Sequence, residues 1–151
     1  MEGRQLRQIT IAQPNELADI LEIDIDVIGA ESRREYLKEA IEENRCLIAK
    51  ADASLVGYLI YNTDFFECSF IALVVVHPLE RNRGYAKELM GYFESVSPTT
   101  KIFTSTNQSN EKMRKLLISI GYVKSGYVEN LDEGDPEIFY FKKRTDNALL
   151  C

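Results

Sequence analysis

The chain has 151 residues with an ordinary hydrophobic share of 45% and a formal net charge of −6. This length and composition predict a single domain, residues 1–151, built around one core. The acidic balance and the lack of a long basic stretch argue against a nucleic-acid partner. No stretch reaches the roughly 18 consecutive apolar residues of a membrane span, so no membrane partner is expected.

The termini and the cysteines bear on where the protein works. The N-terminal residues lack the apolar segment of a signal peptide, which predicts a cytoplasmic location. The three cysteines, Cys46, Cys68 and Cys151, show no metal-ligand spacing, and an odd number in such a chain favours reduced thiols. With His77 as the one histidine, we expect no metal site.

The first half of the chain begins with a predicted strand over residues 4–12, where apolar and polar residues alternate. A turn at Pro14 then leads into a helix that ends near Gly29, and a second helix follows over residues 31–43. The hydrophobic pattern next predicts a hairpin, then a further turn and a long strand that ends at His77. Its strands are expected at 46–51 and 55–61, and the further turn at 63–66.

The stretch from Phe70 to Met90 organises the rest of the chain. An apolar run rich in β-branched residues ends at Pro78, and residues 81–86 then open a helix that runs to about Val96. Backbone N–H groups at a helix N-terminus lack intrahelical partners and suit an anion such as a phosphate. Gly84 lets a ligand approach the backbone closely, and Arg81 and Arg83 add positive charge.

The last third of the chain predicts a strand over 102–106 and a helix that follows a cap region ending at Asn110 and stops at Gly121. Two closing strands are expected over 122–129 and 137–143, and residues 144–151 are expected to form a loose tail. The order of elements is therefore β-α-α-β-β-β-α-β-α-β-β. Such mixing of hairpins and crossover helices predicts an α/β fold, a mixed sheet with helices on both faces.

These features together resemble the GNAT N-acetyltransferase superfamily. Its signature, R/Q-x-x-G-x-G/A after the fourth strand, is matched by residues 81–86, Arg-Asn-Arg-Gly-Tyr-Ala. A second family element, an asparagine, a helix and a glycine–aromatic pair, is matched by Asn110, the helix after it, and Gly121-Tyr122. The order of elements over residues 4–143 also agrees, so the resemblance covers nearly the whole chain.

The resemblance implies that the protein binds acetyl-CoA and transfers its acetyl group, most often to a primary amine. The backbone of Val74 and Val76 would hold the pantetheine arm, and the Val74 amide would face the thioester oxygen. Asn110 would contact the far end of that arm. The pyrophosphate would be held by the loop amides of Arg83, Gly84, Tyr85 and Ala86, with the side chains of Arg81 and Arg83 nearby.

Several routes for proton transfer are compatible with the sequence. Family members often carry an acidic tyrosine at the position that Leu117 occupies here, and no carboxylate holds the usual place of the base. Water could carry the protons, assisted by Glu67, Tyr61, Tyr122 or Tyr127. The thiolate could also leave without a dedicated acid, because a thiol pKa near ~8.5 makes it a tolerable leaving group. A third hypothesis is a CoA-binding or sensing module that performs no transfer.

The expected acceptor is a small-molecule or protein amine. Acidic residues in the loop between the last two strands, and near the first two helices, could attract a cationic amine. The residues concerned are Asp132, Glu133, Asp135, Asp24, Asp26 and Glu31. Either a monomer or a homodimer is compatible with the sequence.

Overall fold

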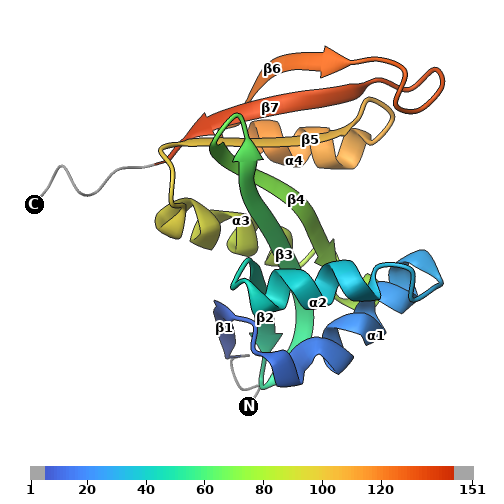
Figure 1. Cartoon of the computed structure of the whole chain (residues 1–151), viewed down its shortest axis with the longest axis vertical. Helices are drawn as coiled ribbons and strands as arrows, with labels where there is room; N and C mark the ends of the chain where they lie inside the picture. The colour runs from blue at the N-terminus through green and yellow to red at the C-terminus, as the bar shows by residue number, and fades with distance from the viewer. Residues whose placement is uncertain (1–5, 145–151) are drawn as a thin grey trace, which may run out of the picture. The chain divides into compact units, whose positions relative to one another are not determined.

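The computed structural model describes residues 6–144, in which one mixed sheet of seven strands is accompanied by four α-helices (Figure 1). The strands are β1 (Arg7–Ile11), β2 (Cys46–Ala51), β3 (Ser54–Phe65), β4 (Cys68–Val76), β5 (Lys101–Asn107), β6 (Val123–Val128) and β7 (Glu137–Lys143). The helices are α1 (Leu17–Ile28), α2 (Arg34–Glu42), α3 (Tyr85–Val96) and α4 (Glu111–Ser119), with short 3-10 turns η1 (Pro14–Glu16) and η2 (Pro78–Glu80). The predicted order of elements is confirmed.

The strand order in the sheet is β1-β2-β3-β4-β5-β7-β6. Strands β4 and β5 pair in parallel, which requires the crossover through α3, whereas the pairs β1–β2, β2–β3, β5–β7 and β6–β7 are antiparallel. The predicted mixed sheet is therefore confirmed.

The chain divides into two compact units by its internal contacts. The first unit combines the residues up to Tyr61 with Leu73–Phe93, and the second combines Asn62–Ala72 with the residues from Glu94 onward. The single domain expected from the chain length stays a prediction.

The core of the first unit lies between the helices α1 and α2 and the strands beside them. Leu37 and Ala40 of α2 and Ile20 of α1 are fully buried against Ile48 of β2 and Tyr58 of β3. The helices are amphipathic at the helical period, so each presents one apolar stripe to this core. Each fully buried aliphatic side chain of this kind stabilises the fold by about 1.5–3 kcal/mol.

The second unit contains the strands β5, β7 and β6 together with α4 (Figure 1). Ile102 and Tyr140 on neighbouring strands are buried, as is Leu117 of α4. The ammonium of Lys142 donates to the carbonyl of Ile120 at the end of α4, at 2.6 Å. Because Lys142 pairs with Ile102, α4 covers the face of the sheet on which these two residues lie.

The prediction of a turn at 63–66 is wrong. Strand β3 continues to Phe65, and the turn consists of Phe66 and Glu67, which both adopt positive φ angles of 52° and 64°. The polar residues from Asn62 to Asp64 suggested an earlier turn. Packing of the Phe65 ring on Phe70, at a centroid distance of 5.1 Å, favours the longer strand instead.

Other boundaries differ from the prediction by a few residues. The second helix begins at Arg34 rather than at residue 31, and the sixth strand covers Val123–Val128 rather than 122–129. The predicted loose tail lies outside the described residues except for Arg144, whose amide donates to the Thr100 carbonyl at 2.7 Å. The start of the first predicted strand and Cys151 also lie outside them. None of the helices in the described part of the chain is long and apolar enough to cross a membrane.

Candidate functional site

The loop between β4 and α3 has the backbone geometry of an anion-binding helix start. Gly84 adopts φ +88°, a conformation that side chains disfavour, directly before the first residue of α3. A Cβ on Gly84 would lie 3.7 Å from a Glu88 carboxylate oxygen and 3.9 Å from an Arg7 nitrogen. The glycine is therefore required by its backbone angle rather than by crowding. The first amides of a helix lack intrahelical acceptors and point outward at such a place.

The two arginines predicted for this loop are both exposed. The Nε of Arg81 donates to the carbonyl of Val76 at 3.3 Å, which ties the loop to the end of β4. Arg83 forms an ion pair with Glu80 at 3.1 Å, and its side chain stays 53% exposed. Both guanidinium groups therefore remain accessible to an anion at the loop.

A third arginine, Arg7 of β1, lies at the same loop and was not found from the sequence. Its Nη1 donates to the carbonyl of Arg83 at 2.9 Å and to the carboxylate of Glu88. Its guanidinium also lies 4.3 Å from the centre of the Tyr85 ring, a cation–π contact. The sequence held one signal for such a residue. Glu88 is acidic and lies in the first turn of a helix expected to bind an anion, so a basic residue that neutralises Glu88 was to be expected.

The remaining predicted residues of the first unit flank this loop. Tyr85 is buried with 2% of its surface exposed, and Ala86 is half-buried. In β4, Val75 is buried in the core beside α1 and α2, whereas Val74 and Val76 are half-exposed. Side chains alternate along a strand, so Val74 and Val76 lie on the face opposite to this core.

Asn110 lies in the second unit and caps α4. Its side-chain oxygen accepts a hydrogen bond from the amide of Met113 at 3.1 Å, which satisfies one of the unpaired donors of the helix start. The capping function expected of an asparagine at this position is therefore present. The side-chain amide nitrogen of Asn110 is not used by this cap.

The three residues predicted for proton transfer have different environments, all within the second unit. Glu67 lies exposed in the turn before β4, and Tyr127 of β6 is 60% exposed. Tyr122 is 1% exposed, and its hydroxyl has no hydrogen-bond partner among the described residues. No hydrogen bond or ring contact of the described residues joins any two of these three side chains.

The surroundings of Tyr122 keep its hydroxyl protonated. Burial raises the pKa of Tyr122, and the nearby Glu94 carboxylate raises it further. Glu94 is itself held by the ammonium of Lys142 at 2.6 Å, and that ammonium lies 5.8 Å from the centre of the Tyr122 ring. Leu117, at the position where family members often carry an acidic tyrosine, is fully buried and has no proton to donate.

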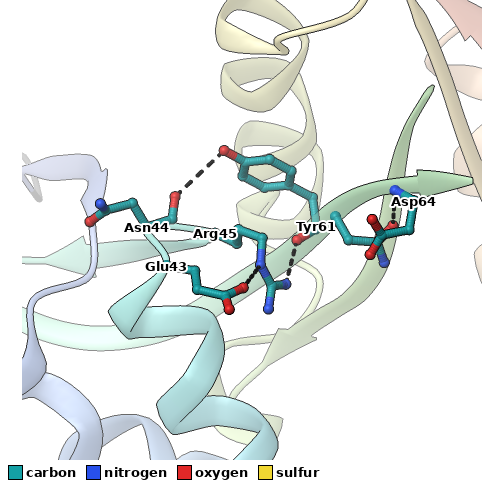
Figure 2. Close-up of polar contacts among 6 residues, drawn as sticks. Glu43, Asn44, Arg45, Tyr61 and Asp64 are labelled. Atoms are coloured by element: carbon teal, nitrogen blue, oxygen red, sulfur yellow. Dashed lines mark hydrogen bonds and ion pairs between the residues drawn. The ribbon is translucent and has the colours of Figure 1, made fainter. Parts of the chain in front are cut away.

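Tyr61, also considered for proton transfer, is held in the first unit (Figure 2). Its carbonyl accepts from Arg45 at 2.8 Å, and its hydroxyl donates to the carbonyl of Asn44 at 3.5 Å. Burial raises the pKa of Tyr61, although Arg45 opposes this shift. Arg45 also pairs with Glu43 at 2.7 Å, so these contacts tie the end of α2 to β3 (Figure 2).

Two carboxylates of the acidic loop before β7 form hydrogen bonds that fix the conformation of the loop. Asp135 accepts hydrogen bonds from the amide and the hydroxyl of Ser109, at 3.0 and 2.6 Å. Asp132 accepts from the side chain of Asn107 at 2.9 Å. Two of the three loop carboxylates predicted to attract an amine therefore also have a structural role. The described residues contain no cluster of His, Cys, Asp and Glu that could hold a metal ion.

Comparisons with known proteins agree with this arrangement. The sequence profile of the acetyltransferase (GNAT) family matches residues 15–122 of the chain. The crystal structure of a GNAT-family acetyltransferase from Bacillus cereus ATCC 10987 is 51% identical, covers 93% of this chain and 99% of its own, and has a TM-score of 0.91.

Two more distant structures share the fold alone. The ribosomal-protein-S18-alanine N-acetyltransferase from Escherichia coli is 11% identical, with 93% of this chain and 96% of that chain covered and a TM-score of 0.80. A Salmonella typhimurium protein described as an acetyltransferase with its cofactor acetyl-CoA is 15% identical, with 94% and 96% covered and a TM-score of 0.72. No curated protein sequence matches the chain.

Proposed function

The chain belongs to the acetyltransferase (GNAT) family, and on this premise we propose that it transfers an acetyl group from acetyl-CoA to a primary amine. The observation that carries the proposal is the loop of residues 81–86. It combines a glycine at φ +88°, two exposed arginines and the start of the 12-residue helix α3. These residues fit the diphosphate of CoA, because they offer outward amides and positive charge at one place.

The residues of the loop would have separate tasks. The amides of Arg83, Gly84, Tyr85 and Ala86 would hold the diphosphate, with the guanidinium groups of Arg81 and Arg83 beside it. The backbone of Val74 and Val76 would hold the pantetheine arm by sheet-like hydrogen bonds. Acetyl-CoA supplies an activated thioester, in which the carbon–sulfur bond breaks as the new carbon–nitrogen bond forms.

Proton transfer in this proposal does not depend on one buried acid. The amine must lose a proton before or during attack, and the thiolate must gain one or leave as the anion. Glu67 and Tyr127 are exposed and can exchange protons with water, and Tyr122 stays protonated in its buried site. The Val74 amide is the proposed donor to the thioester oxygen as negative charge develops there.

Calorimetry with acetyl-CoA tests the proposal. Gly84→Asp should weaken binding by more than about tenfold, or 1.4 kcal/mol, because it places a strained and negatively charged residue at the diphosphate. The matched control is Gly91→Asp, which adds the same charge to the exposed side of α3, where a Cβ would meet no atom within 4 Å. Equal affinity in wild type and Gly84→Asp would contradict the assignment of the loop.

A second candidate function is a CoA-binding or sensing module without turnover. The buried Leu117 at the position of the usual acid favours it. Release of free thiol from acetyl-CoA in the presence of a panel of amines distinguishes the two functions. A cytoplasmic location and a monomeric or homodimeric state remain predictions.

A further inference from the structure

Six of the seven phenylalanines of the chain belong to one aromatic cluster in the second unit. The ring of Phe65 lies at its centre, at centroid distances of 5.1 Å from Phe70, 5.0 Å from Phe103 and 5.6 Å from Phe139. Phe103 extends the cluster to Phe141 at 5.2 Å. Phe66, which is 84% exposed, packs edge-on against Phe65.

Strand register places these rings on one face of the sheet. Phe103 of β5 pairs with Phe70 of β4 on one side and with Phe141 of β7 on the other. Paired residues of neighbouring strands point to the same face, and so do residues two apart on a strand, which adds Phe139. Helix α4 covers the opposite face, on which Ile102 lies. We call the set of Phe65, Phe70, Phe103, Phe139 and Phe141 the phenylalanine face.

The phenylalanine face is left partly open, whereas the opposite face is closed. All five of its members are half-exposed, but Ile102 and Tyr140 on the other face are buried, with 0% and 3% exposed. A continuous, exposed aromatic surface that is bordered by polar groups is typical of binding sites. The phenylalanine face therefore offers an apolar surface for a ligand.

A carboxylate completes the same face. Glu137 lies two residues before Phe139 on β7 and shares its orientation. The hydroxyl of Ser105 donates to its Oε2 at 2.7 Å, which orients the carboxylate. The described residues give Glu137 no cationic partner, and none of their hydrogen bonds uses its other oxygen. An oriented, half-exposed carboxylate beside aromatic rings complements an ammonium group on an apolar body.

We propose that the phenylalanine face holds the aromatic or bulky apolar body of the acceptor amine, with its ammonium group at Glu137. This inference rests on the proposed transfer to an amine and names the class of acceptor. The chain has a net charge of −6, which also favours a cationic ligand over an anionic one.

Charge argues against a second copy of the chain as the occupant. In a two-fold symmetric dimer the same patch is used by both copies, so Glu137 and the acidic loop beside it would approach like charges on the partner. That loop carries Asp132, Glu133 and Asp135. A cationic amine meets no such repulsion.

Kinetics with two amines of similar reactivity test the proposal. We expect kcat/KM for 2-phenylethylamine to exceed that for ethanolamine by at least about tenfold, because only the former carries an aromatic body. Phe139→Ala should raise the KM for 2-phenylethylamine by about tenfold and leave the KM for acetyl-CoA within about twofold. Ile118→Ala, which removes a 57% exposed apolar side chain on α4, is the matched control and should change neither value.

The carboxylate is tested in the same assay. Glu137→Gln should raise the KM for both amines, since both carry an ammonium group. Phe139→Leu should raise the KM for 2-phenylethylamine less than Phe139→Ala does, because leucine keeps part of the apolar contact. Glu39→Gln, which removes an equal charge from the exposed side of α2, should leave the KM of both amines unchanged. The proposal is wrong if kcat/KM is equal for ethanolamine and 2-phenylethylamine and if neither Phe139→Ala nor Glu137→Gln changes the KM for either amine.

Two further measurements keep this inference separate from the proposed function. Calorimetric titration of the protein saturated with CoA by 2-phenylethylamine reports binding without turnover. If 2-phenylethylamine binds, if Phe139→Ala weakens this binding and if no amine causes thiol release, the transfer reaction is refuted but the amine site is supported. Absence of binding would overturn the inference. Sedimentation that shows a dimer dissociated by Phe139→Ala would assign the phenylalanine face to a second copy and also overturn it.

Discussion

Arg7 contributes most to what the structure adds about residues 81–86, the loop that we propose binds the diphosphate of CoA and that we call the diphosphate loop. It lies on β1, at a distance of 76 residues from Arg83, and contacts that residue's carbonyl, the Glu88 carboxylate and the Tyr85 ring. These contacts neutralise an acidic side chain in the first turn of α3 and tie the loop to the sheet. Without Arg7, Glu88 would oppose an anion at the helix start.

We expect Arg7→Ala to raise the dissociation constant of acetyl-CoA by about three- to tenfold, with little effect on kcat at saturation. Arg7→Lys should recover only part of the loss, because an ammonium group cannot reproduce the planar geometry of a guanidinium. Calorimetry measures both. Arg34→Ala is the control, since Arg34 is 53% exposed and pairs only loosely with Glu31, at 3.9 Å. An unchanged affinity in Arg7→Ala would show that Arg7 is not needed to shape the loop.

Among the elements, the connection between α1 and α2 depends on one buried carboxylate. Helix α1 ends at Gly29, which adopts φ +78° and lets the chain reverse. Asp24 in α1 is fully buried and accepts from Arg33 at 2.8 and 3.1 Å and from the Tyr58 hydroxyl at 2.5 Å. Burial raises the pKa of Tyr58, and the hydrogen bond and negative charge of Asp24 raise it further, so the hydroxyl keeps its proton and donates to Asp24. The two helices and β3 are therefore joined through Asp24.

Asp24→Ala should lower the free energy of unfolding by about 3 kcal/mol, because it leaves Arg33 without its partner and Tyr58 with an unsatisfied hydroxyl. Urea unfolding followed by circular dichroism measures the loss as a lower midpoint. Asp19→Ala, in the same helix and exposed, should change stability by less than about 0.5 kcal/mol. Equal midpoints for both variants would show that the buried network adds no stability.

At the scale of the whole molecule, a ligand that binds only the folded chain must stabilise it. The diphosphate loop and its arginines belong to the first unit, whereas Asn110 and the phenylalanine face belong to the second. If the whole chain unfolds in one cooperative step, a ligand bound at the loop raises the free energy of unfolding of the whole chain.

Acetyl-CoA at about 100 times its dissociation constant should add about 2.7 kcal/mol to the free energy of unfolding. For a chain of this size that corresponds to a rise in Tm of about 5–10 °C. Scanning calorimetry or dye-monitored melting gives the shift. Gly84→Asp, tested at the same ligand concentration, should show about half of this rise or less, because its binding is expected to be at least about tenfold weaker. A rise equal to that of the wild type would place the ligand elsewhere.

The sequence by itself determined the order of the elements and the position of the motif at residues 81–86. Alternation with a period of two residues distinguishes strands from helices, and glycine and proline mark where they end, because these signals act between residues near in the chain. The same local pattern at 81–86 identified Arg81, Arg83 and Gly84 without knowledge of distant contacts.

Only the tertiary structure decided which distant residues meet. Arg7 reaches the loop from β1, and Phe65 extends β3 past a polar stretch that looked like a turn. Tyr122, a candidate for proton transfer in the sequence, lies buried in the second unit, as does Leu117. Burial and long-range pairing depend on strand register and on how helices pack, and no short stretch of sequence encodes either. The phenylalanine face arises in the same way, because rings from four strands come together only when β3, β4, β5 and β7 are in place.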